Sequence, residues 1–434
     1  MHDLGIENGK VYIDGVWKRV NLYIDGETIT DISDEVRPAR RKVDASGREV
    51  LPGLIDPHVH FELDLGFITS CDDFLTGSTA AAYGGMTTIV DFLEPVDHVD
   101  ALEPAFRKRL KQAEKSIIDY AFHATIKNPK GDLEAFVLKM KALGMHTLKL
   151  FTTYSDSGRR TDDDAIIELL TLSKKHDFLI FAHIENDDMI ILNPSFTPQD
   201  LPISRPAISE TTEALKLAGY VEQTGGSMYM VHLSSGETLE SLIASYPDLV
   251  NRGFYIESCP QYFTFDNNVL NREDGYLYTF APPLRTLHEK GKMFRYKQHV
   301  YTIGTDHCAF MKKDKNKTLL QETPLGIPGV EHVFHVMRHH MGDEVIPRMT
   351  SRVADLNRLP GKGRIQIGFD ADLLIYEPDP EATCQGSHGT CDYNLYEGHP
   401  APGRVVSTMV RGRFVLDEGK LLGGKGRYIK GGSS

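Results

Sequence analysis

Residues 51–60 read Leu-Pro-Gly-Leu-Ile-Asp-Pro-His-Val-His, an apolar stretch that ends in two histidines, His58 and His60. On a β-strand, residues i and i+2 point to the same side of the backbone, so these two imidazoles converge on one point. That arrangement suits a single metal ion. The pair alone does not establish a metal site, and its meaning depends on the rest of the chain.

The region from residue 51 to residue 357 alternates short apolar strands with longer helical patterns. Residues 162–175 are typical of the helices, because their acidic start and basic end complement the helix dipole. Repeated strand–helix units of this kind predict an α/β fold with a (β/α)₈ TIM-like barrel. An open parallel sheet is the alternative.

Both ends of the chain differ from this middle region in being β-rich. Asp-Gly pairs at 14–15 and 25–26 predict hairpins in the N-terminal part, and residues 371–376 and 404–415 repeat that style. We therefore expect one small β-sandwich domain formed from both chain ends. The predicted division assigns residues 1–51 to its first part, 52–357 to a catalytic barrel, and 358–434 to its second part and tail.

Single polar residues follow three more of the apolar strands. His183 ends Leu-Ile-Phe-Ala-His, His232 ends Met-Tyr-Met-Val-His, and Asp306 ends Val-Tyr-Thr-Ile-Gly-Thr-Asp. Alone, each histidine is more often a core or surface residue than a metal ligand, whereas a buried carboxylate needs a partner because an unpaired buried charge is costly. In a (β/α)₈ barrel, polar groups at the carboxyl ends of strands build the active site. Taken together, these residues predict a metal centre.

Lys149 lies between Leu148 and Leu150, in a stretch whose apolar residues predict a buried strand. A lysine is unusual in a buried strand unless its charge is paired. Burial lowers the pKa of a lysine, and the neutral amine is nucleophilic. Such an amine can add carbon dioxide to form a carbamate, which can bridge two divalent cations as a carboxylate would. The alternative is a lysine whose amino group extends to solvent.

Composition narrows the class of partner. The net charge is −13, and charges of both signs are scattered along the chain, which argues against nucleic acid or an anionic membrane as the main partner. The five cysteines lack CxxC spacing, so neither a disulfide framework nor a thiolate zinc site is indicated. Without a visible signal peptide or a membrane-spanning apolar run, we expect a cytoplasmic protein.

The motifs together resemble the amidohydrolase superfamily, and in particular its cyclic amidohydrolases, the hydantoinases and dihydropyrimidinases. Residues 52–60 are similar to the opening signature of that family, and the similarity continues to residues 411–415. Lys149 resembles the family's carboxylated lysine. His183, His232 and Asp306 resemble the family's remaining metal ligands, in that order.

The resemblance implies two divalent metal ions, with zinc expected and manganese or cobalt as alternatives. One ion would be held by His58, His60 and Asp306, and the other by His183 and His232, with N6-carboxylated Lys149 bridging both. Asp306 would act as general base and then as general acid in opening a cyclic amide or imide. The resemblance also implies a homo-oligomer, either a tetramer or a dimer.

Several residues are expected to contact the substrate. Tyr154 resembles the family tyrosine that donates to the attacked carbonyl oxygen, although a tyrosine packed on the barrel rim is the alternative. Leu63 and Leu65 are expected near the exocyclic substituent of the substrate, because they follow His60 closely in the sequence. Ala281, where the family often has a serine, can offer its backbone carbonyl to a ring N–H. Leu325 stands where the family commonly has an asparagine, which puts the usual imide contact in doubt.

The branch of the family follows from the residues after His60. They read Phe-Glu-Leu-Asp-Leu and lack the arginine that grips the carboxylate in dihydroorotases, and residues 72–88 resemble the hydantoinase pattern. The two acidic residues there also disfavour an anionic ring. Arg159 and Arg160 either recognise a polar or acidic substituent or extend as exposed loop arginines, and the second interpretation is preferred.

Three other functions fit parts of the pattern. A dihydroorotase-like or allantoinase-like enzyme is the alternative within the same chemistry. A non-catalytic dihydropyrimidinase-related protein is disfavoured because all six ligand positions are present. A mononuclear deaminase of the superfamily is disfavoured because those enzymes lack a lysine at the position of Lys149.

Overall fold

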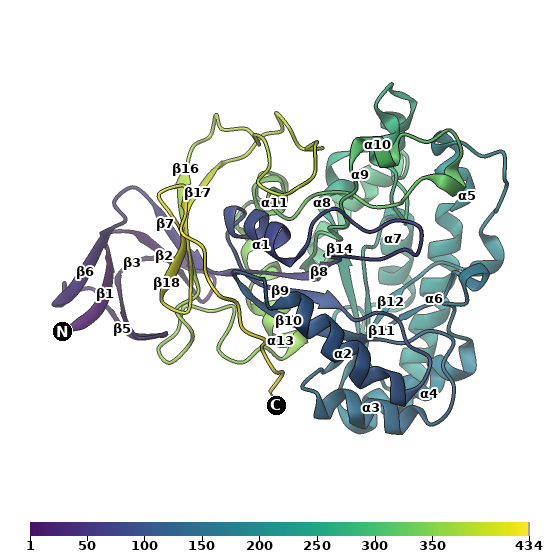
Figure 1. Cartoon of the computed structure of the whole chain (residues 1–434), viewed down its shortest axis with the longest axis horizontal. Coiled ribbons are helices and arrows are strands. Elements are labelled where there is room, and N and C mark those ends of the chain that lie inside the picture. Colours follow the sequence, from purple (N-terminus) through teal and green to yellow (C-terminus); the bar gives the residue numbers. More distant parts are fainter. Residues whose placement is uncertain (433–434) are drawn as a thin grey trace.

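The computed structural model describes residues 1–432, so residues 433 and 434 of the predicted third segment lie outside the described residues. A helix-covered barrel and a smaller β-domain lie side by side (Figure 1). Within the described residues the barrel sheet has eight strands in the order β15-β14-β13-β12-β11-β10-β9-β8, and all its paired strands are parallel. Its strands are β8 (Leu54–Val59), β9 (Met86–Phe92), β10 (Asp119–Thr125), β11 (Thr147–Phe151), β12 (Leu179–His183), β13 (Met228–Met230), β14 (Phe254–Ser258) and β15 (Thr302–Ile303).

The two edges of this sheet approach each other, so the barrel is nearly closed. An isolated parallel bridge joins Val59 to His307, just after β15. The amide of Asp306 donates to the carbonyl of His58 at 2.9 Å, and the amide of His60 donates to the carbonyl of His307 at 2.8 Å. The prediction of a (β/α)₈-type barrel is therefore confirmed.

Helices cover the outside of the barrel because each of the larger ones buries an apolar face against the strands. The helix predicted at 162–175 spans α4 (Asp163–His176), and Asp162 caps its start by accepting from the amide of Ala165. In the described part of the chain, no helix has the length and apolar character needed to cross a membrane. The other helices of eight or more residues are α1 (Phe74–Tyr83), α2 (Val99–Ala113), α3 (Leu133–Ala142), α6 (Ala207–Thr224), α7 (Gly236–Ser245), α9 (Leu287–Tyr296) and α11 (Val333–Met341).

The smaller domain combines strands from both chain ends, as predicted. In Figure 1 the purple N-terminal strands and the yellow C-terminal strands lie together, and β7 (Glu49–Pro52) pairs with β16 (Leu373–Pro378). As far as the structure describes the chain, one sheet has the order β5-β4-β1-β6 and the other β19-β18-β17-β16-β7-β2-β3. Their remaining strands are β1 (His2–Glu7), β2 (Lys10–Ile13), β3 (Val16–Arg19), β4 (Asn21–Asp25), β5 (Thr28–Ser33), β6 (Ala39–Asp44), β17 (Gly403–Val410), β18 (Arg413–Asp417) and β19 (Lys420–Leu421).

A buried ionic cluster joins the barrel to the β-domain. The ammonium of Lys362 lies 2.6 Å from a carboxylate oxygen of Asp119, at the start of β10, 2.7 Å from Asp372 and 2.9 Å from Asp370. Arg411, which follows β17, adds an ion pair to Asp119 at 2.9 Å. The three carboxylates are close enough to hold a metal ion, but the lysine ammonium already provides the cation among them.

We predict that Lys362→Met lowers the free energy of unfolding by about 3–5 kcal/mol, because Asp372 and Asp370 lose their cation, while Asp119 keeps its ion pair with Arg411. Chemical denaturation of the purified protein measures this change. Lys130→Met is the control, since Lys130 pairs with Asp97 at an exposed site and its loss should leave stability nearly unchanged. Equal effects of the two substitutions would contradict the assignment of Lys362 as the interdomain cation.

Candidate metal centre

The six predicted ligands lie at the carboxyl end of the barrel strands. His58 is in β8, Lys149 in β11 and His183 at the end of β12. His60, His232 and Asp306 follow β8, β13 and β15 within a few residues. All six line one cavity of about 560 Å³. The structure therefore brings together every ligand position that the sequence predicts.

His58, His60 and Asp306 form the tightest group. One carboxylate oxygen of Asp306 lies 3.2 Å from Nε2 of His58 and 3.3 Å from Nε2 of His60. The two Nε2 atoms are themselves 3.2 Å apart. Three ligand atoms that converge in this way, two imidazole nitrogens and a carboxylate oxygen, fit a divalent metal ion.

Glu257 orients the first histidine of this group. From β14, its carboxylate lies 2.8 Å from Nδ1 of His58, so Nε2 of His58 faces Asp306. The same carboxylate accepts from the amide of His232 at 2.9 Å and from the hydroxyl of Tyr229 at 2.7 Å. Burial lowers the pKa of His58, but Glu257 and Asp306 outweigh it and raise that pKa to about 9. Carboxylates commonly orient metal-binding histidines in this way.

Glu185 plays the corresponding part for His183. Its carboxylate lies 2.6 Å from Nε2 of His183, and Arg205 pairs with the same oxygen at 2.5 Å. This contact leaves Nδ1 of His183 for the cavity. The ring of His232 lies 4.6 Å from that of His183, and Nδ1 of His232 is buried without a hydrogen-bond partner within residues 1–432. An unpartnered buried imidazole nitrogen fits a metal ligand better than a structural histidine.

Lys149 is buried and does not extend to solvent. Its side chain is 3% exposed, and its Nζ lies 5.5 Å from the ring centre of Phe92 and 5.4 Å from that of Phe151. Among the described residues, no carboxylate lies within ion-pair distance of it. Burial lowers the pKa of Lys149 to about 7. A substantial fraction of the amine is therefore neutral near pH 7, which is the form that adds carbon dioxide.

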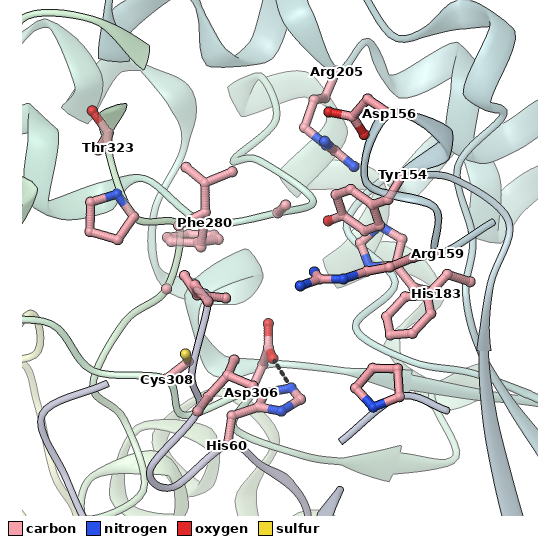
Figure 2. Close-up of a pocket in the computed structure, with 18 of the residues that line it drawn as sticks. His60, Tyr154, Asp156, Arg159, His183, Arg205, Phe280, Asp306, Cys308 and Thr323 are labelled. Carbon is pink, nitrogen blue, oxygen red and sulfur yellow. Dashed lines mark ion pairs between the residues drawn. The ribbon is translucent and has the colours of Figure 1, made fainter. Parts of the chain in front are cut away.

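Tyr154 lies beside His183 (Figure 2). Its ring centre lies 5.1 Å from that of His183, and the guanidinium of Arg205 lies 4.7 Å from the ring. Burial raises the pKa of Tyr154 to about 12, so the phenol keeps its proton at neutral pH and can donate it in a hydrogen bond. Arg205 thus contacts both Tyr154 and the partner of His183.

Backbone strain marks the same site. Tyr154, His232 and Asp306 adopt positive φ values of 69°, 41° and 55°. Non-glycine residues rarely occupy this left-handed region, and such strain gathers where the surrounding structure holds a side chain in a required direction. Three of the predicted site residues therefore carry a conformational cost that a purely structural role does not explain.

The predicted substrate contacts also line the cavity. Leu63 and Leu65 come from the loop after β8, and Ala281 and Leu325 come from two other loops. The mouth is apolar, with Phe67, Ile191 and Leu192 largely exposed.

The two loop arginines separate in the structure. Arg159 lines the cavity, which is contrary to the preferred expectation of an exposed loop residue. Arg160 instead pairs with Asp187 at 3.4 Å and with Asp188 at 3.5 Å.

Sequence reasoning missed the residues that orient the ligands. Glu185 could have been found, since it stands two residues after His183 in Ala-His-Ile-Glu, at the spacing that places side chains on one face. Glu257 and Arg205 offered no comparable local signal, because their contacts join distant segments.

Comparisons with known proteins agree with this geometry. Residues 50–415 match the amidohydrolase family. A D-phenylhydantoinase of Escherichia coli is 30% identical, over 98% of this chain and 97% of that protein. The structure of a D-hydantoinase (dihydropyrimidinase) from Thermus sp. aligns with a TM-score of 0.90 at 29% identity over 98% of both chains. That of a dihydropyrimidinase from Brevibacillus agri aligns with a TM-score of 0.89 at 26% identity over 98% of both chains.

We predict that Glu185→Gln weakens metal binding by about 10- to 100-fold, because His183 loses the carboxylate that orients it. Metal content after dialysis against a graded chelator series measures the effect, and circular dichroism checks the fold. Glu213→Gln is the matched control: Glu213 is buried and pairs with Lys216 at 2.8 Å, outside the cavity. Unchanged metal retention in Glu185→Gln would contradict the orienting role.

Proposed function

This chain belongs to the amidohydrolase family, and on that premise we propose that it opens the ring of a cyclic amide or imide, as hydantoinases and dihydropyrimidinases do. One observation carries the proposal: a His-His-Asp group, two further histidines and an unpaired buried lysine line a single cavity. The cavity, at about 560 Å³, has the size of a small-molecule site.

The donor set fits two divalent metal ions. His58, His60 and Asp306 would hold one ion and His183 and His232 the other, with Lys149 as a carbamate shared by both. Zinc suits imidazole and carboxylate ligands, and manganese or cobalt are alternatives. When bound, such ions supply Lewis acidity toward a carbonyl oxygen and lower the pKa of water.

Asp306 is proposed to move the proton of the reaction. Burial would raise its pKa, but His58 and His60 hold that pKa well below its usual value, so at neutral pH the group is an ionised carboxylate, the form that a general base requires. It takes the proton from water as the oxygen bonds to the ring carbonyl carbon. It then delivers the proton to the ring nitrogen as the carbon–nitrogen bond breaks.

The walls are proposed to position the ring. Tyr154 donates a hydrogen bond to the carbonyl oxygen as negative charge develops there. The backbone carbonyl of Ala281 accepts from a ring N–H, while Leu325 offers only an apolar surface. Leu63 and Leu65 contact the exocyclic substituent. Because the leaving nitrogen and the acyl group stay tethered in one product, the reverse reaction remains accessible. By family resemblance we also infer a homo-oligomer, a tetramer or a dimer.

We predict that fully loaded, active protein contains about two metal ions per chain, and fewer than about 1.5 would exclude a binuclear centre. Lys149→Ala should lose metal and ring-opening activity together. Loading with carbon-13 bicarbonate should give a carbamate resonance in the wild type that this variant lacks. A Lys149→Ala protein with one ion and full activity would instead indicate a mononuclear enzyme.

Ring-opening activity is measured on a panel of hydantoin, 5-substituted hydantoins, dihydrouracil, dihydroorotate and allantoin. Activity on dihydroorotate alone would overturn the assignment to the hydantoinase branch of the family.

We predict that Tyr154→Phe lowers kcat by roughly a hundredfold to a thousandfold with little change in KM, because the lost hydrogen bond matters most in the transition state. Steady-state kinetics on the best substrate of the panel measure this. Phe151→Leu, another cavity-lining change near Tyr154, should have a much smaller effect on kcat. A Tyr154→Phe enzyme with normal kcat would show that the phenol packs on the rim only.

A further inference from the structure

Three arginines line the cavity, and within residues 1–432 Arg159 is the one whose guanidinium pairs with no acidic side chain. The other two arginines of the lining are neutralised, since Arg205 pairs with Glu185 and Arg109 pairs with Asp91, each at 2.5 Å. Within the part of the chain that the structure describes, the Arg159 side chain forms neither an ion pair nor a hydrogen bond. A partly buried, uncompensated guanidinium is unfavourable on its own and becomes favourable when an anion binds it.

The loop after β11 holds Arg159 in this direction. The amide of Arg159 donates to the carbonyl of Tyr154 at 3.0 Å, which closes a tight turn. On the other side, Asp187 accepts from Thr153 at 3.0 Å and pairs with Arg160. The ion pair with Asp187, called the anchor below, therefore holds Arg160 away from the cavity. Figure 2 shows Arg159 extending into the cavity below Tyr154, toward Asp306.

Within the described residues, no acidic side chain of the cavity pairs with Arg159. Asp306, toward which Arg159 extends, pairs instead with His58 at 3.2 Å and His60 at 3.3 Å. Glu62 faces Lys115 at 3.7 Å, and Glu94 pairs with Lys108 at 2.5 Å. Asp64 is exposed and accepts from the amide of Gly66 at 2.7 Å. Asp156, also exposed, lies beside Arg205, and Tyr154 stands between it and Arg159 in Figure 2. The acids that follow His60 are therefore compensated or solvated, and they do not exclude an anionic substrate.

We propose that Arg159 binds a carboxylate carried by the substrate, so that the natural substrate class is a cyclic amide with an anionic exocyclic arm. This inference rests on the proposed ring-opening function. A guanidinium pairs with a carboxylate through two parallel hydrogen bonds, which fixes the orientation of the ring as well as its affinity. The apolar mouth, with Leu65 and Phe67, suits the carbon atoms of such an arm.

The test compares two rings that differ only in charge, hydantoin-5-propionic acid and its amide, on metal-loaded full-length protein. The wild type should prefer the acid in kcat/KM by about tenfold or more, and added salt should reduce that preference. Arg159→Met should lower kcat/KM for the acid about tenfold and change that for the amide by less than about threefold. Arg159→Lys should keep part of the preference, and Arg159→Glu should prefer an aminoalkyl arm. Arg160→Lys, the matched control, keeps a cation for Asp187 and should behave as the wild type.

Three results would overturn the inference. They are equal rates of the wild type on the acid and the amide, equal losses on both substrates in Arg159→Met, or the same loss in Arg160→Lys. Each leaves ring opening itself intact. If neither ring is opened, the proposed function fails instead. Titration calorimetry then measures the binding of the acid and of the amide, and it tests whether Arg159 forms an anion-binding site. Acid binding that Arg159→Met abolishes supports the site, and acid and amide binding equally well contradicts it.

Discussion

Closure of the barrel is the constraint on which the site depends. The first and last strands would otherwise expose unpaired backbone groups, and hydrogen bonds between residues 58–60 and 306–307 satisfy them. The same bonds bring His58 and His60 against Asp306, although about half the chain lies between them. The candidate metal-binding group thus lies where hydrogen bonds of the backbone close the barrel.

Charged side chains that pair with an opposite charge hold the structure together, whereas charged side chains without such a partner face the cavity. Lys362 and its three aspartates join the domains, and the pair of Arg205 and Glu185 fixes a histidine ring. These charges are neutralised, as a stable interior requires. Lys149 and Arg159, in contrast, face the cavity without a carboxylate. Because an uncompensated charge that is shielded from water is costly, these two groups support the ligands proposed for them: carbon dioxide and metal ions at Lys149, and an anionic group at Arg159.

The parts of the site also differ in how strictly the fold defines them. The candidate ligands stand on strand ends whose positions follow from sheet hydrogen bonding, and Glu257 and Glu185 hold two of the imidazoles. The cavity walls proposed to contact the substrate come from loops, which include Leu63 and Leu325. Loops tolerate substitution more readily than strands. The chemistry of the centre therefore follows from the barrel, whereas the choice of ring follows from the loops.

The sequence by itself determined the barrel, the two-ended β-domain and the six candidate ligands, because strand alternation and the strand-end rule are local patterns. His58 and His60 show this directly, since their spacing of two residues places them on one face. Tertiary structure alone decided the partners and the directions of side chains. Glu257 meets His58 across 199 residues, and no local pattern encodes that contact. Arg159 and Arg160 are adjacent in a loop without periodicity, so only the anchor at Asp187 decides which of the two faces the cavity.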